Sequence, residues 1–330
     1  MNGELNNECL APLVHIGYAK AGSTSLQSVL GDPKSGFEPD RDICSRVPRR
    51  ARNDRNIKEY LVQTHDFEFN HEQLRMIANE KLGWAKSSNR VPLISYERLA
   101  GHWITGGHDC KTIADRIRVT WPYARILIIF REQKSMLSSV FRQYIRKGGS
   151  RTFTQLLIPE GTGHSRGPGF SLRHFKYDQL VQYYQDIFGS DNVLALPLEM
   201  LMKDSSGFFE RIFDFSGVQP ENGMQISMPH MKLGIDAYTA GYKRLINPIL
   251  AKDYVNGYSA WCTPGTKIIA RMFMQVVRLL STKKKRAAAA LKLENEISRA
   301  VGDYYGVSNC NLEDLTGIRL EEYGYYLQKS

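Results

Sequence analysis

Short apolar segments that alternate with longer amphipathic segments restrict most strongly what this chain can fold into. Residues 12–17 predict a buried strand that enters a glycine-containing turn, and residues 24–30 predict the start of a helix. Further strands are expected at residues 91–96, 125–130 and 192–196, and further helices at residues 71–84, 111–120, 134–146, 177–188 and 205–216. This alternation predicts an α/β fold in which helices flank a central, mainly parallel sheet.

The strand pattern ends at about Lys232, and aromatic-rich helical segments follow it. We therefore expect an α/β core in residues 1–231 and a helical C-terminal extension in residues 232–330 that packs on this core as a cap. The boundary is approximate, and a single domain is the alternative.

The composition favours a folded chain with an anionic partner. Hydrophobic residues make up 42% of the 330 residues, and 44 Lys and Arg against 34 Asp and Glu give a net charge of +10. This charge indicates an anionic ligand, polymer or membrane surface. The N-terminal residues lack the pattern of a signal peptide, and the five dispersed cysteines have neither CxxC nor Cys/His metal spacing. We therefore expect a cytoplasmic protein without a structural metal.

The loop after the first expected strand has the residues of an anion-binding turn. Residues 17–25 hold two glycines and end in three hydroxyl residues at a helix N-terminus, where backbone N–H groups can hold an anion. The loop is not a Walker A motif, because Ser23 stands where that motif needs lysine. The lysine of this loop is Lys20. The alternative is a tight glycine turn that only joins a strand to a helix.

Residues 20–26 (KAGSTSL) resemble the 5′-phosphosulfate loop of sulfotransferases, and residues 15–17 and 26–27 extend the likeness to the bacterial form. Ala21 and Ser23 replace the usual hydroxyl residues of that loop. The resemblance implies a P-loop-like, three-layer fold and the donor 3′-phosphoadenosine 5′-phosphosulfate (PAPS), which leaves as the bisphosphate PAP. The donor ligands that it implies in this loop are Lys20, Ala21, Gly22, Ser23, Thr24 and Ser25.

A second segment resembles the 3′-phosphate site of the same family. There a strand ends in Arg131, and Ser139 follows eight positions later. Chemically, the arginine offers a forked charged donor and the serine a neutral one. The alternatives are a surface ion pair and a helix-surface hydroxyl. The resemblance covers about residues 12–250, and it implies Lys232 as a further ligand of the 3′-phosphate and adenine.

The resemblance implies a metal-independent, in-line transfer of a sulfuryl group to a hydroxyl or amine of a glycan or small molecule. Lys20 would neutralise charge on the leaving phosphate, and Glu97 or His102 would remove the acceptor proton. His65 or Asp66 replaces them if the preceding segment folds over the pocket. For Glu97 the alternative is an ion pair with a neighbouring arginine or a helix cap, and for His102 it is a loop residue without a catalytic role.

Two other functions compete with this interpretation: a P-loop kinase, and a basic protein that binds polyanions without catalysis. The missing Walker lysine disfavours the kinase, and the joint presence of Lys20, Arg131 and Ser139 disfavours the binding protein. No nucleic-acid partner is expected. The identity of the acceptor and the oligomeric state stay open.

The C-terminal part contains a basic, apolar helix. Lys267, Arg271 and Arg278 share one face of the helix expected at residues 267–280, and the basic run KKKR follows at residues 283–286. Contact with a membrane surface through residues 267–286 is one interpretation. A core-packed helix followed by a solvated basic turn is favoured, because so much of the helix is apolar.

Overall fold

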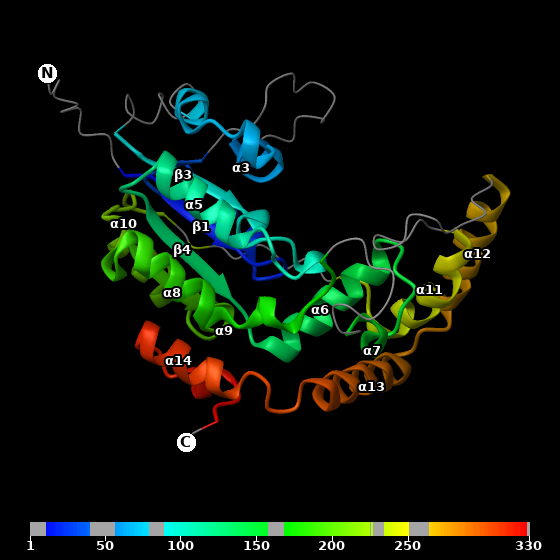
Figure 1. The fold of residues 1–330 in the computed structure, drawn as a ribbon. Coiled ribbons are helices and arrows are strands. Elements are labelled where there is room, and N and C mark those ends of the chain that lie inside the picture. Colours follow the sequence, from blue (N-terminus) through cyan, green and yellow to red (C-terminus); the bar gives the residue numbers. More distant parts are fainter. Residues whose placement is uncertain are drawn as a thin grey trace, which may run out of the picture.

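A parallel sheet of five strands forms the centre of the computed structural model, which describes residues 11–39, 57–78, 89–157, 168–224, 226, 234–250 and 264–328. The strand order is β2-β3-β1-β4-β5, and Figure 1 labels the three central strands β3, β1 and β4. The strands are β1 (Leu13–Gly17), β2 (Phe37–Pro39), β3 (Val91–Tyr96), β4 (Arg125–Phe130) and β5 (Val193–Pro197). The register pairs Val14 of β1 with Ile94 of β3 and with Ile126 of β4. The predicted α/β fold with a parallel central sheet is confirmed.

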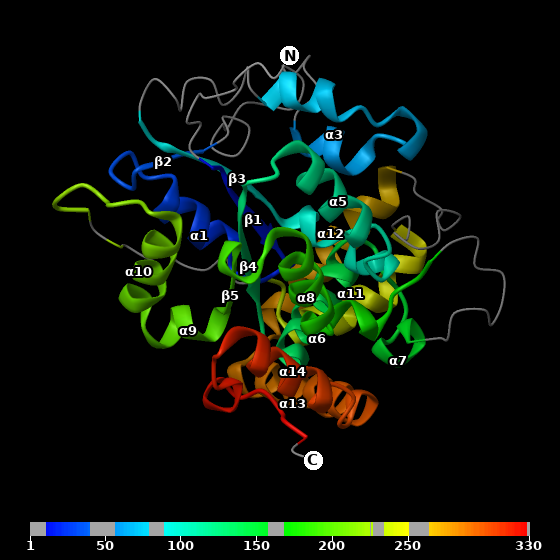
Figure 2. The same cartoon turned by 60° about the vertical axis from the view of Figure 1, so that its left-hand side comes forward.

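Helices cover both faces of the sheet, so the strands β1, β3 and β4 are almost completely buried apolar runs. Figure 2 shows α1 (Ser23–Leu30) and α10 (Ser205–Ser216) on one side of the strands, and α5 (Cys110–Thr120) and α8 (Tyr177–Phe188) on the other. This arrangement follows from right-handed crossovers, because the chain leaves β1 toward β2 but returns from β3 across β1 to β4. Because the strands are parallel, their carboxyl ends and the loops that follow them gather at one edge of the sheet.

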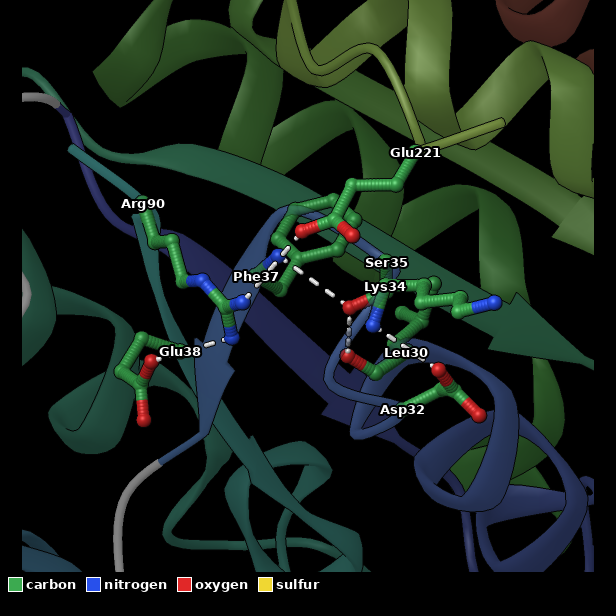
Figure 3. Close-up of polar contacts among 8 residues, drawn as sticks. All are labelled: Leu30, Asp32, Lys34, Ser35, Phe37, Glu38, Arg90 and Glu221. Atoms are coloured by element: carbon green, nitrogen blue, oxygen red, sulfur yellow. Dashed lines mark hydrogen bonds and ion pairs between the residues drawn. The ribbon is translucent and has the colours of Figure 1, made fainter. Parts of the chain in front are cut away.

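The edge strand β2 was not predicted from the sequence. It follows a turn in which the Ser35 hydroxyl donates to the Leu30 carbonyl oxygen (2.7 Å) and accepts from the Phe37 N–H (3.1 Å; Figure 3). Arg90 lies 3.4 Å from a Glu38 carboxylate oxygen and 3.6 Å from one of Glu221. These contacts lie where β3 begins, at the amino edge of the sheet.

Helices after residue 234 pack on the core at two places. α11 (Ala237–Leu250) and α13 (Lys283–Val301) contact α6 (Gln133–Arg146), and α14 (Gly306–Thr316) contacts α8. Gln133 Nε2 donates to Asn309 Oδ1 (2.5 Å) in a buried contact, and the Tyr325 hydroxyl donates to Glu199 (3.0 Å). These contacts agree with the expected C-terminal cap, and the division at residue 231 stays a prediction.

The expected core packing of the helix at residues 267–280 is wrong. The helix forms as α12 (Pro264–Leu279) and packs on α11, but most of its described apolar side chains are exposed, and Val277 is the buried exception. The main contact of α12 with the described elements is with α11, which leaves most of these apolar side chains exposed. Figure 1 shows α12 at the outer end of the molecule. Within the described part of the chain, every helix is too short or too polar to span a bilayer.

The other elements are α3 (Ile57–Gln63), α7 (Phe153–Leu156) and α9 (Leu198–Lys203), with short 3₁₀ turns between them. Residues 71–78 are helical, as predicted for the first part of 71–84, and the rest of that segment lies outside the described residues.

Candidate active site

The loop between β1 and α1 forms a tight turn at the carboxyl edge of the sheet. Lys20 and Gly22 have positive φ angles of 69° and 79°, and the Ala21 N–H donates to the Tyr18 carbonyl oxygen (3.1 Å). A Cβ atom on Gly22 would lie 2.5 Å from Leu198 Cδ1. Glycine is required here because the left-handed backbone and the close approach both exclude a side chain.

The start of α1 has donors that an anion could accept. The first helical bonds run from the N–H groups of Ser25 and Leu26 to the Gly22 carbonyl oxygen (3.0 and 3.1 Å), which leaves the N–H groups of Ser23 and Thr24 outside the helical bonds. The first turn holds no acidic residue and no side-chain cap. The buried Ser23 hydroxyl has no hydrogen-bond partner among the described residues. This set of donors fits a phosphate or sulfate group.

A buried histidine supports the loop from below. His15 Nδ1 lies 2.7 Å from Ser95 Oγ, which also accepts from Gln27 Nε2 (3.0 Å). The Ser95 hydroxyl thus links the His15 ring to Gln27. Burial lowers the pKa of His15 to about 3, so the ring is neutral at physiological pH. A Cβ atom on Gly17 would lie 3.1 Å from this ring, so the histidine leaves little room for a larger residue at position 17.

Arg131 follows β4 and reaches toward the loop. Its guanidinium donates twice to the Ser135 hydroxyl, from Nε (3.1 Å) and Nη2 (2.6 Å), and from Nη1 to the Lys20 carbonyl oxygen (3.4 Å). Its own carbonyl oxygen accepts from the Tyr177 hydroxyl (2.8 Å). No carboxylate pairs with this guanidinium within the described ranges. The fork is therefore held in place by neutral groups, with its charge uncompensated by a salt bridge.

One face of α6 continues this cationic site. Ser135, Ser139, Arg142 and Arg146 are spaced by four, three and four residues, so they share a stripe along the helix. Burial lowers the pKa of Lys20, and the positive charges of Arg146, Arg142 and Arg131 lower it further. The stripe therefore faces the loop, and three arginines gather near Lys20. Such a group of cations is stabilised by a bound anion.

Glu97 is the acidic residue of this site. It follows β3, whose Tyr96 pairs with Ile16 of β1, so it lies beside the start of the loop. Its carboxylate is the one group that raises the pKa of Lys20 against these effects. Arg98, the adjacent arginine, pairs instead with Asp109 (2.5 Å). The geometry thus brings Lys20 and Glu97 together at the ends of two neighbouring strands.

His102 is held by its surroundings in a way that restricts its chemistry. Its Nδ1 accepts from the Ile104 N–H (3.2 Å), and its backbone N–H donates to Asp109 Oδ1 (3.1 Å). Burial and the charge of Arg98 lower the pKa of the imidazole, although Asp109 acts in the opposite direction. An imidazole that accepts a bond at Nδ1 carries its neutral-state proton on Nε2, so the lone pair that a base needs is already engaged by the Ile104 N–H.

The remaining predicted residues are His65, Asp66 and Lys232, and the structure describes the first two. Asp66 is exposed and pairs with Arg116 of α5 (2.6 Å), and His65 is exposed beside Phe67. Lys232 lies outside the described residues. No group of three metal-binding side chains occurs in the ranges that the structure describes.

A cavity of about 760 Å³ lies on the α5 and α8 side of the loop. Tyr18 of the loop, Lys111, His174 and Tyr183 are among its lining residues. Burial lowers the pKa of His174 to about 3, so this wall carries a neutral imidazole, whereas Lys111 brings positive charge. The cavity therefore borders the loop at Tyr18.

Searches with protein-family models and among curated proteins give no match. A sulfotransferase structure from Alicyclobacillus acidocaldarius aligns with 96% of this chain and 99% of its own chain, with a TM-score of 0.53 and 13% sequence identity. The chain has the fold of that sulfotransferase. Two further sulfotransferase structures align with this chain at lower TM-scores: the domain from the curacin biosynthetic pathway (69% of this chain and 82% of that chain covered, TM-score 0.39, 14% identity) and mouse SULT7A1 complexed with PAP (94% and 90% covered, TM-score 0.39, 15% identity).

Sequence reasoning missed part of the site on this sulfotransferase fold. Ser135, which holds Arg131, was not singled out from the sequence, and for Arg142 and Arg146 a solvated basic helix face was favoured over phosphate contacts. Their common spacing with Ser139 on one helix face was the signal that could have found them. The direction in which that face points depends on how α6 packs.

Proposed function

We propose that the protein is a sulfotransferase that takes a sulfuryl group from PAPS and transfers it to a hydroxyl or amine of a glycan or small-molecule acceptor. The observation that carries the proposal is the meeting of Lys20, the open start of α1 and the Arg131 fork at one edge of the sheet. The shared fold with a known sulfotransferase supports it.

The residues present fit the donor. The N–H groups of Ser23 and Thr24 and the unpartnered Ser23 hydroxyl would hold its 5′-phosphosulfate, while Ala21, Gly22 and Ser25 shape the turn. Arg131 and Ser139 would hold the 3′-phosphate, and Lys232 is a further proposed ligand. When bound, the donor supplies the sulfuryl group.

The chain's own residues divide the catalytic work. The Lys20 ammonium would neutralise negative charge that develops on the leaving phosphate, and its partial burial strengthens that interaction. Glu97 would accept the acceptor proton, because it is exposed at the neighbouring strand end and its charge acts on Lys20. His102 is the second candidate base, although its bond from Ile104 opposes that role.

The acceptor is assigned to the cavity beside Tyr18, because this loop residue forms part of its wall. A Gln179→Trp substitution narrows the cavity from its exposed rim and should raise the acceptor KM without changing PAP binding. Gln182→Trp is the matched control, since Gln182 lies on the same helix outside the lining. If both substitutions raise the acceptor KM equally, the cavity beside Tyr18 is not the acceptor site.

The donor is tested by thermal and chemical unfolding with PAP. A ligand that binds only the folded state at about one hundred times its Kd stabilises it by about 3 kcal/mol. We expect this stabilisation with PAP and a smaller one with Mg-ATP. Equal or stronger stabilisation by Mg-ATP would favour the P-loop kinase instead.

The Arg131 assignment is tested by comparing two ligands. Arg131→Ala should weaken PAP by about 10- to 100-fold and adenosine 5′-phosphosulfate much less, because the lost charged fork serves the 3′-phosphate. Arg90→Ala, at the opposite edge of the sheet, is the control and should leave both affinities unchanged. If Arg131→Ala weakens both ligands equally, Arg131 does not hold the 3′-phosphate.

A further inference from the structure

The outer face of α12 is an apolar surface that the rest of the described chain leaves largely exposed, although the Phe273 ring lies beside Tyr242 of α11 (6.3 Å between ring centroids). Six side chains of α12 and that of Leu280, which directly follows it, are between 41% and 85% exposed and are together called the α12 patch: Ile268, Ile269, Met272, Phe273, Val276, Leu279 and Leu280. At the helical repeat these positions share one sector, and the buried Val277 borders that sector next to Phe273. Such a contiguous apolar surface marks an interaction site.

Positive charge borders the α12 patch on one side. Arg271 and Arg278 lie on the neighbouring sector of the same helix and are exposed. The exposed run at residues 283–286, KKKR, follows at the start of α13. The sequence contains neither Asp nor Glu from residue 264 to residue 293. The partner of this surface must therefore offer apolar groups beside negative charges.

We infer that the α12 patch docks into the interfacial region of a membrane that contains anionic lipids. The apolar side chains would enter the boundary between headgroups and acyl chains, and the cations would contact the lipid phosphates. The helix would lie on the membrane, because it is not long and apolar enough to cross one. A second copy of this chain fits less well, because a two-fold contact of this surface would bring like charges together.

Vesicle sedimentation with the full chain tests the docking. We expect binding to phosphatidylcholine vesicles that contain phosphatidylglycerol and little binding to phosphatidylcholine alone. Ile269→Gln with Leu279→Gln should weaken binding about tenfold or more. Met202→Gln with Val307→Gln removes two similarly exposed apolar side chains outside the patch and should leave binding unchanged. All variants should keep the parent's unfolding temperature, because the replaced side chains are exposed.

The charge contribution is tested by reversal. Lys283→Glu with Lys284→Glu should weaken binding to anionic vesicles about tenfold or more, whereas Lys203→Glu with Arg211→Glu makes the same net change on α9 and α10 and should have a small effect. The inference is overturned if the parent does not bind the vesicles, or if a test variant and its matched control lose the same binding. A parent dimer that dissociates in the variant with Ile269→Gln and Leu279→Gln would overturn it as well. None of these readouts depends on sulfuryl transfer.

Discussion

The buried ring of His15 should make the fold less stable in mild acid. Its pKa is about 3 in the folded chain against 6.5 as the ordinary value, because burial disfavours the charged form. Below pH 6.5 the unfolded chain therefore binds a proton that the folded chain does not take up. Stability is fully present above pH 6.5 and falls as the pH drops toward 3.

The size of the effect follows from the two pKa values. Between pH 7 and pH 5, one such histidine lowers the free energy of unfolding by about 2 kcal/mol. His174 has the same pKa of about 3 and should contribute a similar amount. In His15→Asn the amide oxygen can still accept from Ser95, but the titration is lost, so the pH-dependent loss should shrink by about 2 kcal/mol.

Urea unfolding at pH 7, 6 and 5, followed by circular dichroism, measures this difference. The variable of interest is the change with pH, so a constant loss of stability in His15→Asn does not affect the result. His65→Asn replaces an exposed ring and should keep the parent's pH dependence. If His15→Asn and the parent lose the same stability between pH 7 and pH 5, the neutral buried ring is refuted.

Four further substitutions test the candidate active site. Lys20→Ala should reduce single-turnover rates at least about tenfold more than it weakens PAP binding measured by calorimetry; equal losses would assign the lysine to binding alone. Glu97→Gln should slow transfer about 10²- to 10⁴-fold with PAP affinity unchanged, and His102→Gln only a few-fold; the reverse order would make His102 the base. Gly22→Ala should lower the free energy of unfolding by about 1–3 kcal/mol, because of its φ of 79° and the contact with Leu198; unchanged stability in urea would contradict this geometry.

The strands were predictable because each is a short apolar run between turns. β3 and β4 match their expected ranges, β1 begins one residue later than expected, and β5 is shifted by one residue at both ends. β2 was missed because its three residues, which include a proline, carry no strand pattern. It exists through pairing with β3, which is a tertiary effect.

The candidate site was predictable where a residue directly follows a strand. Lys20, Glu97 and Arg131 come after β1, β3 and β4, and parallel strands place their ends together. Pairing choices were not predictable: Arg98 takes Asp109 as its partner, and Arg131 takes Ser135. Both depend on how loops and helices pack, which local sequence does not encode.

The contacts of the C-terminal segment with the start of α6 affect how the site forms during synthesis. Asn309 holds Gln133, and Tyr325 holds Glu199, whose Oε1 accepts from the Glu132 N–H (3.1 Å) next to Arg131. A ribosome makes the loop and all five strands before it makes these supports. A nascent chain is therefore expected to complete this support of Glu132 and Gln133, at the start of α6, only after residue 325 has left the ribosome.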